Sequence, residues 1–319
     1  MLSIFVKDPA TIVFLTVIAA FLLVCLLLKT CARFLPRDAG RDFAHDGTLS
    51  AGKPRGAGFL FILAFAAVTL LILPFSLETG IYLILLIAAM MTGYLDDGSK
   101  TPWGEYKKGL LDLIIAVLVA VTYLNFNPAE IRVELLNTTV QIPAVVYAVL
   151  TVVLVWVSIN VTNCTDGVDG LSATVSSITL GSLYVVMLVN DTAALFRDTI
   201  PVFIFCLLAY LLFNAHPSKL MMGDAGSRAM GLFIAICAIK SGSPLLYVLT
   251  AIVLILDGGL GLVKVSLLRF LKIHIMKNIR TPLHDHVRKN KGWSDTQTVM
   301  RFAIFQLLAC VLALYFVLV

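Results

Sequence analysis

Two adjacent acidic side chains form the first candidate site in this apolar chain. Asp96 and Asp97 are followed by Gly98, at the end of a long hydrophobic run. Adjacent carboxylates repel each other unless a proton or a cation lies nearby. We therefore interpret the pair as candidates for binding Mg²⁺ or for acting as a general base. The alternative that this motif leaves open is a solvated, hydrophilic helix end.

A second polar segment, NVTNCTDGVDGL, occupies residues 160–171 between two apolar runs. Amide and carboxylate groups can bond to the edge of a uracil ring or to ribose hydroxyls, and the two glycines permit close approach of the backbone. The start of the following helix would add N–H donors suited to phosphate. The segment predicts a nucleotide-binding loop, against the alternative of an Asx-rich turn that only caps the helix. Its candidate binding residues are Asn160, Asn163, Asp166 and Asp169.

A third segment contains Asn214 and then Asp224, which lies between glycines in the sequence MGDAGS at the start of a predicted helix. Mg²⁺ binds through one or two carboxylates together with waters and substrate phosphates. Asp224 is therefore a candidate metal ligand. The competing interpretation is an aspartate that merely caps the helix.

The fourth segment is the sequence TPLHDH, which contains His284, Asp285 and His286 and is followed by basic residues. An imidazole next to these cations can contact or position a diphosphate. Zinc binding is a weaker interpretation, because no cysteine or further histidine lies nearby in the sequence. A solvated charged loop is the other alternative.

Three cations outside these segments complete the candidate site. Lys53, Arg55 and Lys108 can neutralise phosphates as point charges. Lys108 and Asp112 are also spaced four residues apart at the start of a predicted helix, where they can pair with each other.

Composition indicates what holds these segments in place. Of the 319 residues, 60% are hydrophobic and 13% are charged, against roughly 25% charged in soluble domains. The mean hydropathy is +0.97. We predict an all-α integral membrane protein, a single polytopic domain over residues 1–319 with about ten transmembrane helices, each of about 20 residues. The expected spans are 11–33, 56–77, 80–95, 108–125, 141–160, 168–190, 199–214, 226–241, 244–268 and 299–319.

The positive charges predict the orientation of these spans. Nineteen of the 24 lysines and arginines fall in the odd-numbered loops, including Arg41 and Lys100, whereas Lys7 and Lys240 are among the four on the other side. Cytoplasmic loops carry such an excess, so both termini are expected on the periplasmic or extracellular side. The acidic motifs lie at the cytoplasmic ends of the spans, which predicts an active site on that face. The net charge of +5 then reflects topology, not nucleic-acid binding.

In this order, the four segments resemble the polyprenyl-phosphate N-acetylhexosamine-1-phosphate transferase superfamily, and most closely its phospho-N-acetylmuramoyl-pentapeptide transferases. The resemblance covers nearly the whole chain. It rests on the ordered motifs DDG, NxxNxxDGxDGL, NAHPxxxxMGDAGS and TPLHDHxxxxKGWSD. The chain departs from the family at Asp285, where the middle of three successive histidines is usual, and at Met221, which replaces an aromatic residue.

The resemblance implies a phospho-sugar transferase of the bacterial inner membrane. Undecaprenyl phosphate would attack the sugar-side phosphorus of UDP-N-acetylmuramoyl-pentapeptide, with Mg²⁺ as cofactor. The products would be UMP and lipid I, the first lipid-linked precursor of peptidoglycan. Phosphoryl transfer of this kind needs mainly alignment and charge neutralisation. A homodimer is compatible with the resemblance.

The same resemblance implies roles for individual residues. Asp224 would bind Mg²⁺, and Asp96 or Asp97 would act as the base or contact the lipid phosphate. Phosphate contact or positioning of the donor would fall to Lys108, His284 and His286. The other candidates for substrate binding are Lys53, Asn160, Asn163, Asp166, Asp169, Asn214, Met221 and Asp285.

Two other functions compete with this interpretation. An N-acetylglucosamine-1-phosphate transferase of the same superfamily would share the motifs for uridine diphosphate, although the KGWSD segment favours the muramoyl-pentapeptide branch. A membrane transporter would gather its ionisable residues near the middle of the bilayer. Apart from Asp257 and Lys264, the expected spans are nearly free of such residues there.

Overall fold

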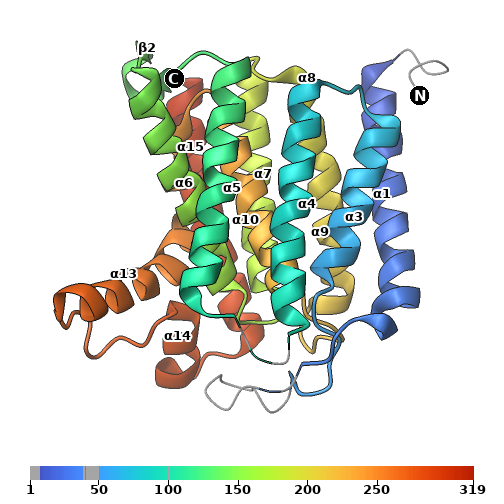
Figure 1. Cartoon of the computed structure of the whole chain (residues 1–319), viewed down its shortest axis with the longest axis vertical. Coiled ribbons are helices and arrows are strands. Elements are labelled where there is room, and N and C mark those ends of the chain that lie inside the picture. The colour runs from blue at the N-terminus through green and yellow to red at the C-terminus, as the bar shows by residue number, and fades with distance from the viewer. Residues whose placement is uncertain (1–7, 39, 41–49, 100, 102) are drawn as a thin grey trace.

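The computed structural model describes residues 8–38, 40, 50–99, 101 and 103–319. Lys7, Arg41 and Lys100, which contribute to the predicted charge bias, lie outside the described residues. Long helices run side by side along one axis, and the start of α1 and the end of α15 lie at the same end of the bundle (Figure 1). The long helices are α1 (Pro9–Cys31), α3 (Gly58–Ile72), α4 (Leu77–Asp97), α5 (Glu105–Phe126), α6 (Ala144–Thr165), α7 (Leu171–Val189), α9 (Thr199–Asn214), α10 (Gly223–Lys240) and α15 (Asp295–Leu318).

Short elements join and end these helices. A two-stranded antiparallel hairpin between α5 and α6 is a small departure from the expected all-α fold, and it pairs Glu130 with Gln141. The short elements are β1 (Glu130–Val133), β2 (Thr138–Gln141), α8 (Ala194–Arg197), α11 (Tyr247–Thr250), α12 (Ile252–Leu254), α13 (Leu260–Ser266) and α14 (Leu283–Lys291), with single turns of other helix types between some of them.

Every expected span contains a helix, but fewer than ten are long and apolar enough to cross a membrane on those grounds alone. Within the described residues there are seven such helices, or eight if one bent pair counts as a single span. The bent pair joins Pro244–Thr250 to Ile252–Leu271 at 68°. The remaining two are α3, which is shorter, and α10, which carries three charged residues. The chain is thus a helical, multi-pass membrane protein.

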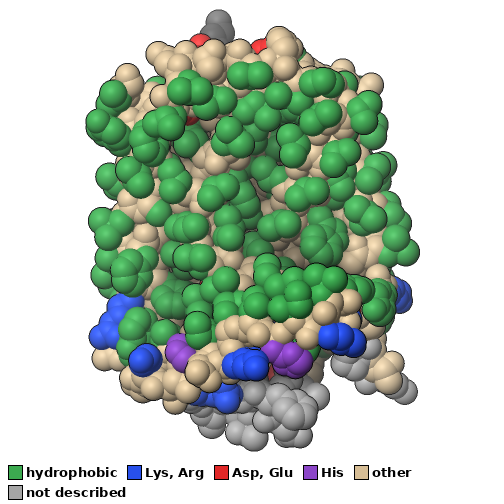
Figure 2. All heavy atoms as spheres, turned by 90° about the vertical axis from the view of Figure 1, so that its left-hand side faces the viewer, with side chains coloured by type: hydrophobic (Ala, Val, Ile, Leu, Met, Phe, Trp, Pro, Cys, Tyr) green, Lys and Arg blue, Asp and Glu red, His purple; other side chains and the backbone are tan. Residues whose placement is uncertain are grey.

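Side chains on the outer surface fit this arrangement. Hydrophobic groups cover most of the height of the face shown in Figure 2, and lysine, arginine and histidine side chains form a band near its lower end. That end is also where α14 lies in Figure 1. Cationic side chains thus gather at one end of an apolar surface, as is typical where a membrane protein meets water.

Helix α10 lies at the centre of the bundle, and each of its 18 residues is buried. It packs against α3, α4, α6 and α7. Two glycines bring its first turn close to its neighbours, because a Cβ at Gly93 would lie 2.3 Å from the carbonyl oxygen of Asp224 and one at Gly58 would lie 2.0 Å from the nitrogen of Gly226. The end of α4 and the start of α3 therefore meet the start of α10, where the acidic motifs gather.

The bent span is stabilised by one side chain of α15. Ala251 departs from helical geometry, with φ −126° and ψ 20°. Across the break, the Gln306 amide donates to the carbonyl oxygen of Thr250 at 2.6 Å and accepts from the backbone N–H of Val253 at 3.0 Å. The amide thus supplies hydrogen bonds to backbone groups at the break in the helix. Lipid has no polar groups that could supply them instead. Beyond the break the chain leaves the bundle as the projecting α13 arm (Figure 1).

We predict that Gln306→Met destabilises the fold while nearly preserving side-chain volume, because it leaves the buried N–H of Val253 without its partner and the Thr250 carbonyl with only the weak Cys310 thiol contact at 3.8 Å. Each buried unsatisfied group costs about 1–3 kcal/mol, so the melting temperature of the purified protein in detergent should fall by several degrees. Leu307→Met, at a lipid-exposed position of the same helix, is the control and should melt like the wild type. Equal melting temperatures for all three proteins would contradict this account of the break.

Candidate functional site

Asp224, at the start of α10, is held between two cations at the lower end of the bundle. Lys108 on α5 lies 2.9 Å from one of its carboxylate oxygens and also pairs with Asp96 at the end of α4. Arg55 lies 3.4 Å from the other oxygen, through Nη2, and 2.9 Å from Asp97 through Nε. The structure therefore unites Asp96, Asp97, Lys108 and Asp224, as their positions at helix ends predict.

The alternative in which Lys108 pairs with Asp112 on its own helix is wrong. Lys108 instead reaches Asp96 and Asp224, whereas Asp112 binds the guanidinium group of Arg228 at 2.5 Å. Lys108 and Asp112 thus each form ion pairs with residues on other helices. Their four-residue spacing along α5 does not reveal this.

A cavity of about 460 Å³ opens beside this cluster. Helix ends and loops that are distant in the sequence supply its walls. Arg55, a predicted phosphate-binding cation, also lines it, and so do Asp38 and Ser218, which were not among the predicted site residues. The predicted residues that line the cavity are Lys53, Asn163, Asp166, Asp169, Asn214, Met221 and Asp224.

The loop between α6 and α7 forms one wall of the cavity. Asp169 accepts from the backbone N–H of Ser218 at 2.9 Å, and the Asn163 amide donates to the Ser227 hydroxyl at 2.8 Å. Burial, together with the nearby charge of Asp224, raises the pKa of the Asp166 carboxyl to about 7. The raised pKa means that the negative charge of Asp166 is disfavoured here, so a proton or a cation beside it is favoured.

The side chains of Asn214 and Asn160 both form hydrogen bonds to other groups of the protein. The side-chain oxygen of Asn214 accepts from the N–H of Gly170 at 2.8 Å, and its nitrogen donates to the carbonyl of Leu220 at 2.9 Å. Asn214 thus fixes two loops that line the cavity. Asn160 donates to Asp112 at 3.4 Å and to the carbonyl of Trp156 at 2.8 Å, and it is not among the described residues that line the cavity.

His284 has a buried partner that the motif did not suggest. Asp257 accepts from the His284 backbone N–H at 2.7 Å, and its second oxygen lies 2.8 Å from Nδ1 of the ring. Asp257 belongs to a π-helical turn (Ile255–Gly259), a distortion that often marks functional sites. The other ring nitrogen of His284 faces Gly167, since a Cβ there would lie 2.3 Å from Nε2. His284 therefore reaches the loop that contains Asp166.

The other two residues of the histidine motif face elsewhere. Nδ1 of His286 accepts from the backbone N–H of Arg280 at 3.3 Å. None of His284, Asp285 and His286 is among the described residues that line the cavity. His284 and His286 thus have different surroundings.

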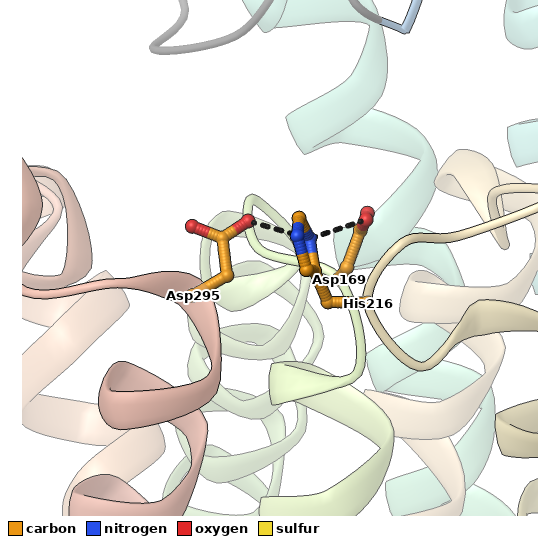
Figure 3. A group of neighbouring side chains, drawn as sticks. All are labelled: Asp169, His216 and Asp295. Carbon is orange, nitrogen blue, oxygen red and sulfur yellow. Dashed lines mark ion pairs between the residues drawn. The ribbon is translucent and has the colours of Figure 1, made fainter.

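A second cluster, His216 with Asp169 and Asp295, also lines the cavity. Nδ1 of His216 lies 3.4 Å from Asp169 and 3.3 Å from Asp295, and Figure 3 shows the ring between the two carboxylates. The three groups come from the loop before α7, the loop before α10 and the first turn of α15. They are close enough to share a cation, but Arg288 already pairs with Asp295 at 2.7 Å. The cluster joins three segments, and sequence analysis did not select His216 or Asp295.

Comparison with known proteins places the chain in a family. The model of Glycosyl transferase family 4 matches residues 79–242. A phospho-N-acetylmuramoyl-pentapeptide-transferase of Treponema pallidum (strain Nichols) is 38% identical, over 94% of this chain and 88% of the relative. Proteins of the same name from Geobacillus kaustophilus (strain HTA426) and Chlamydia caviae are 29% and 30% identical, over 96% and 82% of this chain and 98% and 80% of their own length. The chain therefore belongs to glycosyl transferase family 4, in the group of the phospho-N-acetylmuramoyl-pentapeptide-transferases.

Proposed function

We propose that the protein transfers phospho-N-acetylmuramoyl-pentapeptide from its UDP-linked donor to undecaprenyl phosphate, forming lipid I and releasing UMP. The observation that carries this proposal is the position of Asp224, bound by Lys108 and Arg55 beside a cavity lined by amides and carboxylates. Carboxylates and cations that converge from separate helices can hold a metal and two phosphates in line, which is what phosphoryl transfer requires.

The residues around Asp224 fit a magnesium ion. Mg²⁺ prefers oxygen ligands and usually takes one or two carboxylates together with waters and substrate phosphates. The raised pKa of Asp166, at about 7, supports a need for positive charge next to Asp224. We propose Asp224 as the ligand, with Asp166 nearby. When bound, the ion would neutralise charge on the donor diphosphate.

Lys108 and Arg55 are the proposed phosphate-binding cations. Each now pairs with two or more carboxylates, and donor phosphates would replace part of those contacts. Asp97 is fully buried against Arg55 and accepts from the N–H of Ala225 at 3.2 Å, so we propose that it positions the start of α10. That leaves Asp96 as the proposed base or contact for the lipid phosphate.

The cavity would hold the nucleotide part of the donor. Its volume of about 460 Å³ lies within the usual range for small-molecule sites. Asn163, Asp169 and Lys53 would bond to uracil or ribose, and Met221 offers an apolar surface to the base. Of the histidine motif, His284 has the proposed role at the phosphates, since it is the member that reaches the nucleotide loop.

The proposal includes the position of the protein in the membrane. We propose ten spans, in which α3 and α10 cross the membrane packed against longer neighbouring helices. Both termini would lie outside the cytoplasm. The site would face the cytoplasm of a bacterial inner membrane, and the whole chain would act as one catalytic unit. The band of lysine and arginine at the end that carries the site supports this orientation (Figure 2).

The donor can be tested directly. With undecaprenyl phosphate and Mg²⁺ present, the purified enzyme is expected to release UMP from UDP-N-acetylmuramoyl-pentapeptide and not from UDP-N-acetylglucosamine. The two donors share uridine diphosphate, so the difference must arise from contacts to the peptide arm. Faster release from UDP-N-acetylglucosamine would favour the N-acetylglucosamine-1-phosphate transferase alternative.

Asp224→Asn is expected to lower kcat by roughly 10²–10³-fold, the usual cost of losing one preorganised electrostatic contact. An amide is a poor Mg²⁺ ligand compared with a carboxylate, so the remaining activity should also need more Mg²⁺. Asp191→Asn, at an exposed position outside the site, is the control. The measurement is UMP release across a Mg²⁺ titration, with melting temperature as a check on folding. A folded variant with wild-type Mg²⁺ dependence would restrict Asp224 to capping the helix.

Labelling of single cysteines tests the orientation. In a cysteine-free background, Ser99→Cys at the end that carries the site should resist a membrane-impermeant thiol reagent in intact cells. Thr139→Cys, on the exposed β2 strand, should react. The opposite pattern would move the site to the outer face.

A further inference from the structure

Two opposite-charge contacts, separated by one helical turn, join α5 to α10. Lys108 and Asp112 lie four residues apart on α5, and Asp224 and Arg228 lie four residues apart on α10, so each pair occupies one face of its helix. The first contact joins Lys108 to Asp224 at 2.9 Å, and the second joins Asp112 to Arg228 at 2.5 Å. In the first contact the cation is on α5, and in the second contact the cation is on α10.

The two contacts differ in their access to solvent. The side chains of Arg228 and Asp112 are 2% and 3% exposed, whereas that of Lys108 is 28% exposed. Lys108 is therefore the most exposed member of the two contacts, although only its partner Asp224 is among the described residues that line the cavity. The contact between Arg228 and Asp112 is enclosed, and neither residue is among the described residues that line the cavity.

Arg228 also binds the backbone next to the site. Its Nη2 atom donates to the carbonyl oxygen of Lys108 at 3.4 Å, and Asn160 on α6 donates to the second oxygen of Asp112 at 3.4 Å. Among the described residues, α5 packs closely against α4 and α6 and not against α10. These long side chains thus form the link between α5 and the helix that carries Asp224.

We propose that Arg228 and Asp112 are positioning residues for Lys108. They hold the first turns of α5 at a fixed height and rotation against α10 while Lys108 exchanges its carboxylate partners for the donor diphosphate. The inference rests on the proposed function, because it assigns Lys108 to the phosphates. It places Asn160 with this buried contact and not with the nucleotide.

A purely structural role is the competing explanation. Buried ion pairs are weak evidence for stability, since apolar replacements of both partners are often tolerated, whereas removing one partner leaves an uncompensated charge. The test therefore removes both charges together, in Asp112→Leu/Arg228→Met. The matched control is Glu78→Leu/Lys240→Met, which removes another ion pair of α10 at its opposite end, 2.9 Å long and with side chains that are 15% and 6% exposed.

The readout is binding of UDP with Mg²⁺, measured by calorimetry on the full-length protein in detergent. UDP carries the diphosphate that Lys108 is proposed to meet. We expect Asp112→Leu/Arg228→Met to weaken UDP binding by about 10-fold, as expected for one misplaced charge-assisted contact, and to lower kcat with the muramoyl-pentapeptide donor. The control should bind UDP like the wild type, whatever its melting temperature.

A thermodynamic cycle with Lys108→Met identifies the route of the effect. If the pair acts through Lys108, adding Asp112→Leu/Arg228→Met to Lys108→Met should weaken UDP binding by less than about twofold further, whereas independent sites would multiply their effects. Arg228→Lys, which keeps the charge but loses the planar fork of donors, should fold and bind UDP with intermediate affinity. It provides the measurement if the double variant does not fold.

The possible outcomes are distinguishable. Multiplicative losses in the cycle, wild-type UDP affinity in the folded double variant, or wild-type UDP affinity in Arg228→Lys would each overturn the positioning role. Failure of the wild type to turn over the muramoyl-pentapeptide donor, with normal UDP binding, would overturn the proposed donor and leave the positioning role to be judged by the cycle. If the wild type does not bind UDP, both proposals are wrong.

Discussion

The fold depends on one constraint, which is the complete burial of a helix that carries three charges. Each charge of α10 requires a partner, and each partner lies on a neighbouring segment. Lys108 and Arg55 meet Asp224, Asp112 meets Arg228, and Glu78 meets Lys240. These contacts fix how the surrounding helices are rotated. The site is therefore at one end of a series of ion pairs that extends along the whole of α10.

Much of this arrangement follows from the sequence because its signals are local. Apolar runs predict the helices, and the lysine and arginine bias predicts which ends share a face. The acidic motifs lie at those ends, so Asp96, Asp97 and Asp224 could be expected together, and the structure unites them with Lys108. The polar loop before α7 was likewise recognisable by its density of amides, carboxylates and glycines.

What the sequence does not reveal depends on how helices are rotated about their axes. Asp257 appears there as an isolated acid in an apolar run, and a π-helical turn brings it to His284. Lys108 and Asp112 fit a local pair, yet both bind across helices. The expected ten spans exceed the seven or eight that length and composition alone support, because α3 is short and α10 is charged. Their neighbours, not their own composition, make them part of the bundle.

The composition of α10 also has a consequence for how the protein is made. A charged residue near the centre of a spanning helix costs about 2.5–3.5 kcal/mol at insertion, and Arg228 lies two turns or less from the middle of α10. Entry of this helix into lipid by itself is therefore unfavourable. Its partners lie on helices that precede it in the chain, with Glu78 on α4 and both Lys108 and Asp112 on α5, so we expect these helices to be inserted before it. If α10 spans the membrane as proposed, the helix that carries Asp224 thus enters a membrane that already holds its partners.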